Sequence, residues 1–138
     1  MSNLIQNTVI NKTAIPLFRQ FLNLSSVRHK LIAGNLANVA TPAYKSKDID
    51  FHGEFKKAIN AKGHLAAVTT HPAHIPVGQS RHTSPEIIEN ESTDTNGINN
   101  VNVDDEVANL AQNQIYFSVG ARLLAKQFEG LRTAIKSK

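Results

Sequence analysis

The 138-residue chain contains no cysteine, which excludes disulfide bridges, thiol catalysis and cysteine-based zinc sites. It also has no uninterrupted apolar run near the roughly 20 residues that cross a bilayer, so we expect no direct membrane insertion. The N-terminus, MSNLIQNTVINKTAIP, carries one lysine and lacks both an apolar core and a small-residue cleavage site. It therefore does not predict a standard secretory signal. The chain is expected to be cytosolic or to leave by a route that needs no cleaved signal peptide.

Motifs that carry catalysis are missing as well. The sequence has no GxSxG or HExxH motif of a hydrolase and no GxxxxGK or GxGxxG loop of a nucleotide-dependent enzyme. Because no residue pattern points to chemistry, we predict that the chain is not an enzyme and binds no cofactor.

The histidines in the middle of the chain are the candidate metal ligands. This group consists of His64, His71, His74 and His82. Pro72 disfavours a helical pairing of the two nearest histidines, and no Asp or Glu lies between residues 56 and 85 to complete a carboxylate site. We therefore predict no metal site, although a metal-dependent enzyme is kept as the third functional alternative.

The net charge of +4 is segregated along the chain. Residues 12–62 carry nine basic and three acidic side chains, whereas residues 86–106 carry seven acidic and no basic ones. The acidic block would repel phosphate, and the aromatic residues follow a helical spacing instead of alternating with Lys and Arg. These features predict no nucleic-acid binding.

The last third of the chain contains a long amphipathic repeat. Apolar or small residues recur at alternating steps of four and three, which predicts a helix of about 50 Å that packs lengthwise in a coiled-coil seam. The seam consists of Val103, Val107, Leu110, Gln114, Phe117, Ala121, Leu124, Phe128, Leu131 and Ile135, and only the polar Gln114 interrupts the apolar pattern. Asn102 stands at the expected N-cap, and acidic residues 104–106 favour the positive end of the helix. Gly120 and Gly130 each cost a helix about 1 kcal/mol, which predicts close approach of a neighbouring backbone.

A second helix is predicted over residues 16–38. Pro16 suits the first helical turn, and Pro42 disfavours helical geometry at Thr41. Arg28 lies within the apolar side of this helix, either as an edge residue with a packed stem or as a buried partner for a carboxylate of another subunit. Paired antiparallel, this helix would cover about two thirds of the seam, because its length is about 35 Å. The remainder favours association with the leader or with another subunit.

The middle of the chain has weaker signals. Residues 48–51 alternate polar and apolar, residues 65–70 favour β structure, and residues 86–89 are compatible with a short strand. The predicted fold class is therefore mainly α, with long N- and C-terminal helices in a hairpin or coiled coil and a small irregular or β-containing middle. We divide the chain into an N-terminal helical arm (1–45), the middle segment (46–101) and a C-terminal heptad helix (102–138), whose arms form one helical domain.

A short polar motif follows the first long helix. It comprises Asn35, Leu36, Ala37, Asn38, Thr41, Pro42, Tyr44 and Lys45. The two asparagines share one helix face and can bridge backbone groups of an adjacent helix, while Tyr44 can pack as an anchor. A helix terminus with polar caps explains the same residues equally well.

This motif resembles the signature of the flagellar rod, hook and hook-associated axial proteins. That signature reads Asn, Ile or Leu, Ala, Asn, two variable residues, Thr, Pro, Gly, Tyr or Phe, and Lys or Arg. The resemblance continues in residues 46–51, 70–75, 101–114 and 131–136. Ala43 replaces the usual glycine, which favours a type I turn over the type II turn that Pro-Gly supports.

The resemblance implies a structural subunit of the bacterial flagellar basal-body rod, in its proximal part. Such subunits assemble helically, through their terminal helices, into a hollow shaft that transmits torque across the periplasmic space. They leave through the flagellar type III export apparatus without a cleaved signal peptide. The implied partners are copies of the chain, other rod proteins, the rod adaptor FliE and the MS-ring base. The alternative is a soluble coiled-coil adaptor or chaperone-like binding module.

Overall fold

The computed structural model describes residues 13–60, 84–91 and 97–136 of the chain. Its elements in chain order are helix α2 (Ile15–Ala37), strand β1 (Lys47–Ile49), helix α3 (Phe51–Asn60), strand β2 (Ile87–Glu89) and helix α4 (Val103–Lys136). The mainly α fold class is therefore confirmed. The histidines 64, 71, 74 and 82 and the β-favouring residues 65–70 lie outside the described residues.

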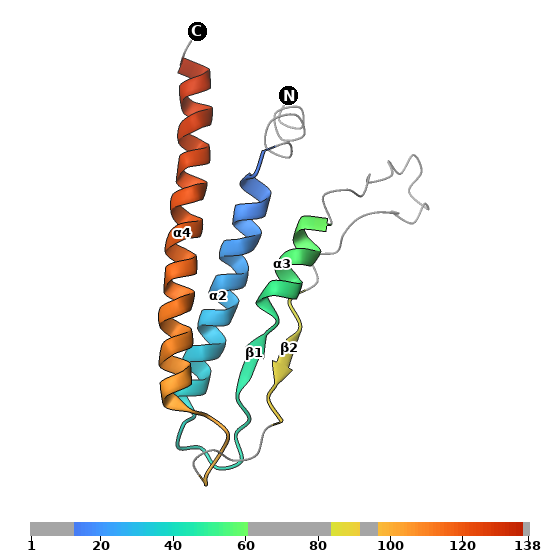
Figure 1. Cartoon of the computed structure of the whole chain (residues 1–138), viewed down its shortest axis with the longest axis vertical. Helices are drawn as coiled ribbons and strands as arrows, with labels where there is room; N and C mark the ends of the chain where they lie inside the picture. The colour runs from blue at the N-terminus through green and yellow to red at the C-terminus, as the bar shows by residue number, and fades with distance from the viewer. Residues whose placement is uncertain (1–12, 61–83, 92–96, 137–138) are drawn as a thin grey trace, which may run out of the picture.

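Helices α2 and α4 lie side by side and run in opposite directions (Figure 1). Pro16 occupies the first turn of α2, where its missing N–H has no intrahelical partner to lose, and Asn38 is the C-cap. At the start of α4, Asn102 Oδ1 accepts a hydrogen bond of 3.0 Å from Asp104 N. The predicted N-cap is thus present, and the predicted bounds of α2 agree with the observed ones within one residue.

The buried apolar core of the helix pair is small. Leu24 and Ile32 of α2 are 1% and 2% exposed. The buried positions of α4 are Glu106, Asn113 and Gly120, which recur every seven residues on one side of the helix. Two of these three are polar, so the contact is more polar than a coiled-coil seam.

Strands β1 and β2 form a two-stranded antiparallel sheet, with Lys47 opposite Glu89 and Ile49 opposite Ile87. The predicted strand at residues 86–89 is confirmed. Ile49 is buried, while the side chains of β2 are exposed. The sheet lies beside the lower half of α2 (Figure 1).

Helix α3 was not predicted, because the alternation in residues 48–51 favoured a strand throughout. The strand ends at Ile49, and Asp50 Oδ1 instead accepts a hydrogen bond of 2.9 Å from Gly53 N in the first turn of α3. Phe51 and Phe55, one helical turn apart, each place their ring edge-on to Phe21 of α2, with centroid separations of 5.2 Å. A carboxylate cap followed by two aromatic residues at i and i+4 is the signal that indicates this helix.

Candidate functional site

The first residue of the polar motif, Asn35, joins three segments of the chain. It is 1% exposed, and its Nδ2 donates to Lys47 O of β1 and to Glu106 Oε1 of α4, both at 2.9 Å. Its Oδ1 accepts from Lys47 N at 2.9 Å and from the Tyr44 hydroxyl at 3.2 Å. Asn35 therefore ties the end of α2 to both neighbouring elements, as the bridging interpretation predicts.

Asn38 behaves differently from Asn35. Its Nδ2 donates to Gly34 O at 2.8 Å, and its Oδ1 accepts from Thr41 Oγ1 at 3.1 Å. Both side-chain bonds are local to the helix end, so of the two interpretations left open by the sequence, the Asn38 side chain fits the polar cap and not the bridge. Its role is that of a polar cap.

The turn after Pro42 also differs from the prediction. Ala43 has a φ of 57°, and Tyr44 N lies 3.4 Å from Thr41 O across the turn. A positive φ at this position belongs to a type II turn and not to the predicted type I turn. The turn therefore keeps a glycine-like geometry even though alanine occupies the position, and the Ala43 N–H is held by a bond of 3.1 Å to Ile98 O.

Asn99 donates hydrogen bonds to carbonyl groups at the C-terminal end of α2. Its side chain is fully buried, and Nδ2 lies within 3.0 Å of the carbonyl oxygens of Asn38, Val39 and Thr41. Carbonyl groups at a helix end have no intrahelical donor, so a buried amide stabilises them directly.

Asn100 continues this network into the sheet region. Its Oδ1 accepts from Ser46 N at 2.8 Å and its Nδ2 donates to Asn90 O at 2.6 Å. Sequence reasoning missed both Asn99 and Asn100, because asparagines that follow a glycine indicate a solvated loop by composition.

Arg28 forms a bidentate ion pair within the chain. Its Nε and NH2 groups contact the two carboxylate oxygens of Asp48 at 3.0 and 2.9 Å. The Arg28 side chain is 14% exposed and the Asp48 side chain 45%, so the guanidinium is mostly covered while its carboxylate partner lies at the surface. The expected carboxylate partner is present, but it comes from β1 of the same chain and not from another subunit.

Asn35 marks the junction of α2, β1 and α4, and Glu106 is the buried carboxylate of this junction. Burial raises its pKa, while the hydrogen bond from Asn35 acts in the opposite direction. Asp48 and Asp105 raise the pKa further, and Arg28 lowers it. Its Oε2 has no hydrogen-bond partner among the described residues.

The rest of the motif lies at the surface of the turn. Ala37, Thr41, Pro42 and Lys45 are exposed, while Leu36, Asn38 and Tyr44 are half-buried. The structure therefore brings the motif together at one end of the helix pair, with Asn35 inside and most of the other members facing outward (Figure 1).

None of the ten predicted seam residues is buried in α4. Val103, Val107, Gln114, Phe117, Phe128 and Ile135 are exposed, and Leu110, Ala121, Leu124 and Leu131 are half-buried. On a helical wheel of 100° per residue, the seam is rotated by roughly 60° from the stripe of Glu106, Asn113 and Gly120 that faces α2. The stripe of α4 that faces α2 is therefore not the predicted seam, although four of the ten seam residues are half-buried.

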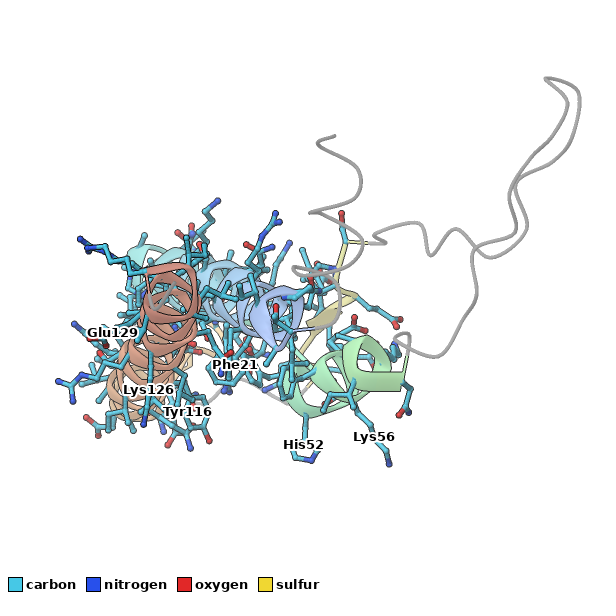
Figure 2. The ribbon with its side chains drawn as sticks, turned by 90° about the horizontal axis from the view of Figure 1, so that it is seen from above. Phe21, His52, Lys56, Tyr116, Lys126 and Glu129 are labelled. Carbon is cyan, nitrogen blue, oxygen red and sulfur yellow. The ribbon has the colours of Figure 1, made fainter. Side chains whose placement is uncertain are left out.

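The two flanks of α4 have different neighbours. On one flank, Tyr116 reaches the aromatic rings of Phe21 and Phe51, with centroid separations of 6.2 and 5.7 Å. Figure 2 shows Phe21 and Tyr116 between α4 and α3 when the molecule is viewed from above. The seam lies on the other flank, where the described part of the chain provides little cover.

The two glycines of α4 have different surroundings. A Cβ at Gly120 would lie 2.7 Å from Phe21 Cδ1 and 3.2 Å from Leu22 Cδ2, whereas a Cβ at Gly130 would meet no described atom within 4 Å. A neighbouring helix therefore does approach Gly120 closely, but the atoms nearest to it belong to the side chains of Phe21 and Leu22 and not to the backbone. Of two neighbouring polar residues of α4, Asn113 is buried in the contact and its Nδ2 donates to Ser25 O at 2.9 Å, whereas Gln114 is exposed.

No group of three His, Asp or Glu side chains suited to a metal ion occurs in residues 13–60, 84–91 and 97–136. Over the same ranges, none of the helices combines the length and apolarity that a bilayer span requires. The described part of the chain offers polar and apolar contact surfaces.

Long paired helices with a capped turn at one end and an uncovered apolar flank define a structural, assembly-type protein. Comparison with known proteins agrees with this class. Flagellar basal body rod protein FlgB of Cereibacter sphaeroides is 32% identical over 117 residues, which cover 85% of this chain and 89% of the relative. The FlgB proteins of Escherichia coli (30% over 127 residues, 86% and 90%) and Borrelia hermsii (28% over 133 residues, 92% and 98%) are similar over comparable lengths. No family model matches the chain.

The chain belongs to the FlgB family of flagellar basal body rod proteins. Its role is that of a structural rod subunit and not of an enzyme, which confirms the prediction from the sequence.

Proposed function

We propose that the chain assembles with copies of itself and with other rod proteins into a hollow, torque-transmitting shaft at the base of the flagellum. In this proposal α2 and α4 pair as a helical hairpin of the coiled-coil type, and the arms 1–45 and 102–138 form one domain around the middle segment 46–101. The antiparallel contact of the two helices supports the pairing, and the names of the relatives support the place in the rod.

The exposed apolar flank of α4 is the observation that carries this proposal. Val107, Phe117 and Phe128 are 52%, 47% and 52% exposed, and Ile135 is 78% exposed. Fully burying each such side chain contributes roughly 1.5–3 kcal/mol, so covering this flank by a neighbouring subunit would strongly favour association. The seam thus acts between subunits.

The surface of the polar motif is the second proposed contact. Asn35 is committed to the fold of its own chain, so the exposed residues Ala37, Thr41, Pro42 and Lys45 are the ones available for lateral or axial contacts. Half-buried Tyr44 fixes this surface through its bond to Asn35.

Further partners follow from the family. The adaptor FliE and the MS-ring base are the proposed neighbours at the membrane side. Delivery by the flagellar type III export apparatus without a cleaved signal peptide places the assembled chain in the periplasmic part of the rod.

Substitution of the seam by a charge tests the proposal. Phe128→Asp and Leu124→Asp should abolish rod assembly and motility, since a carboxylate cannot be buried at a subunit contact without a partner. Exposure of Phe128 predicts that Phe128→Asp changes the free energy of unfolding by less than about 0.5 kcal/mol. Electron microscopy of basal bodies and motility in soft agar provide the measurements.

Gln112→Asp is the matched control, because Gln112 is exposed on α4 and lies on the side of the helix away from the seam. It should leave motility unchanged. Export of each variant into the medium of a strain arrested at the rod stage separates a defect in assembly from a defect in delivery. Normal motility of Phe128→Asp would refute the role of the seam.

A further inference from the structure

A cleft of about 690 Å³ lies between the two-stranded sheet and the start of α4. Its walls come from β1, β2 and the first turns of α4, at the end of the molecule opposite the end of α4 (Figure 1). Its volume is large enough to receive side chains from another molecule.

The cleft is strongly acidic. Its lining contains the carboxylates of Asp48, Asp50, Glu89, Glu91, Asp105 and Glu106, against one basic side chain, Lys47. Two of these charges are compensated, since Asp48 pairs with Arg28 and Glu89 pairs with Lys47. The other four carboxylates have no ion pair among the described residues.

Glu106 is the innermost of these four carboxylates. It is 9% exposed, and its Oε2 has no hydrogen-bond partner in the described part of the chain. A carboxylate in this state is costly, and a nearby cation reduces the cost. Because no three side chains of the described residues are arranged to hold a metal ion, the cleft suits an ammonium or guanidinium group better than a metal.

The opposite end of α4 carries the complementary charge. Arg122, Lys126, Arg132 and Lys136 are exposed there, together with one carboxylate, Glu129. Figure 2 shows Lys126 and Glu129 on this part of α4. Asp105 and Arg132 belong to one straight helix and are about 40 Å apart, so the basic end cannot reach the cleft of its own chain.

We propose that the acidic cleft receives Arg132 and Lys136 from the end of α4 in a second copy of this chain. The contact joins two different surfaces, so it is head-to-tail and can propagate from one subunit to the next. It rests on the proposed function and adds to it a directional, charge-selected contact that is separate from the apolar seam.

Charge-swapped variants test this contact. Glu91→Lys with Asp105→Lys reverses the cleft, and Arg132→Glu with Lys136→Glu reverses the basic end. Sedimentation of the purified full chain should show wild-type association at low salt that weakens as salt is added, because the contact is ionic. Each double variant should require about tenfold higher concentration to associate. An equimolar mixture of the two should recover the wild-type level, because each reversed surface then meets a complementary one.

Glu86→Lys with Asp104→Lys is the matched control. Asp104 shares the first turn of α4 with Asp105 but does not line the cleft, and Glu86 lies next to β2 outside it. This control should associate like the wild type, and circular dichroism checks that every variant keeps its helices. A wild type that stays monomeric at low salt, double variants that associate normally, or a mixture that fails to recover would each overturn the proposal. If the cleft variants build normal rods while Phe128→Asp does not, the rod function stands and only the cleft contact fails.

Discussion

The first and the last turns of α4 differ in the contacts that they make with the rest of the chain. The first turns carry the cap from Asn102 and the buried Glu106 and Asn113, each held by a hydrogen bond within the chain. The last turns extend past the start of α2 (Figure 1), and Phe128 and Ile135 are exposed there. The first end is thus held against α2 by polar contacts of its own chain, whereas the second leaves its apolar and basic groups uncovered in the described part of the chain.

This difference shows how a polar contact can set the position of a helix. Leucine side chains would allow α2 and α4 to slide by a turn at small cost, but a buried amide or carboxylate must meet its particular partner. Glu106 meets Asn35, and Asn113 meets the Ser25 carbonyl. The pairing register is therefore fixed near the junction, which defines the direction of the free end.

The largest predicted effect is at the junction. Asn35→Ala would remove the partners of the Lys47 N–H and carbonyl groups and of the Glu106 carboxylate, all in a buried site. We expect it to lower the free energy of unfolding by about 3 kcal/mol, measured by urea denaturation. Asn38→Ala, which loses local bonds only, should cost about 1 kcal/mol or less. Equal losses in the two variants would contradict the distinction between a bridging and a capping asparagine.

Replacing the two glycines of α4 by alanine should change the free energy of unfolding in opposite directions. Gly120→Ala should destabilise the chain by about 1 kcal/mol, because the new Cβ would overlap with Phe21, whose ring is confined by Phe51 and Phe55. Gly130→Ala should stabilise it by up to about 1 kcal/mol through helix propensity alone. Thermal unfolding of both variants measures the difference, and stabilisation of both would show that the helices can separate at Gly120.

The smallest predicted effect is a change in pH dependence. The raised pKa of Glu106 means that its ionised form is disfavoured in the folded chain, so its unfavourable contribution is present above that pKa. The contribution disappears as the pH falls through the raised value towards the ordinary carboxyl value. Glu106→Gln keeps an acceptor for Asn35 and removes the titration. Its stability gain over wild type should be largest near pH 7, below about 1 kcal/mol, and should shrink as the pH falls towards 4.5. A stability gain that does not vary with pH would contradict this assignment. Asp104→Asn, which removes an exposed carboxylate from the same turn of α4, is the control and should not show this gain.

The sequence predicts the elements of this fold better than their contacts. The bounds of α2, the cap at Asn102 and the strand at residues 86–89 follow from local rules that act within a few residues. The side of α4 that faces α2 could not be predicted from apolar spacing, because buried Glu106 and Asn113 are polar and satisfy their groups across the chain. The predicted seam and the stripe that faces α2 both repeat every seven residues, so the spacing alone does not show which of them packs against α2.

The hydrogen-bond partners of the polar motif could be predicted from the sequence only in part. Asn35 bonds to a residue 71 positions away, and Asn99 reaches carbonyl groups about 60 positions away, so no local pattern indicates either contact. At Ala43 a local preference does predict a conformation, but the structure has a different one. Its local preference favours φ below zero, and the hydrogen bond of its N–H to Ile98 belongs to a tertiary setting that overrides the preference.

Hydrogen exchange along α4 tests the contrast between its two ends most directly. In dilute, monomeric protein the amides of residues 106–120 should exchange at least about a hundredfold more slowly than those of residues 127–136. On association the protection of residues 127–136 should rise by a larger factor than that of residues 106–120, which the contact with α2 already protects. Uniform protection along α4 in the monomer, or no gain at residues 127–136 on association, would contradict the account.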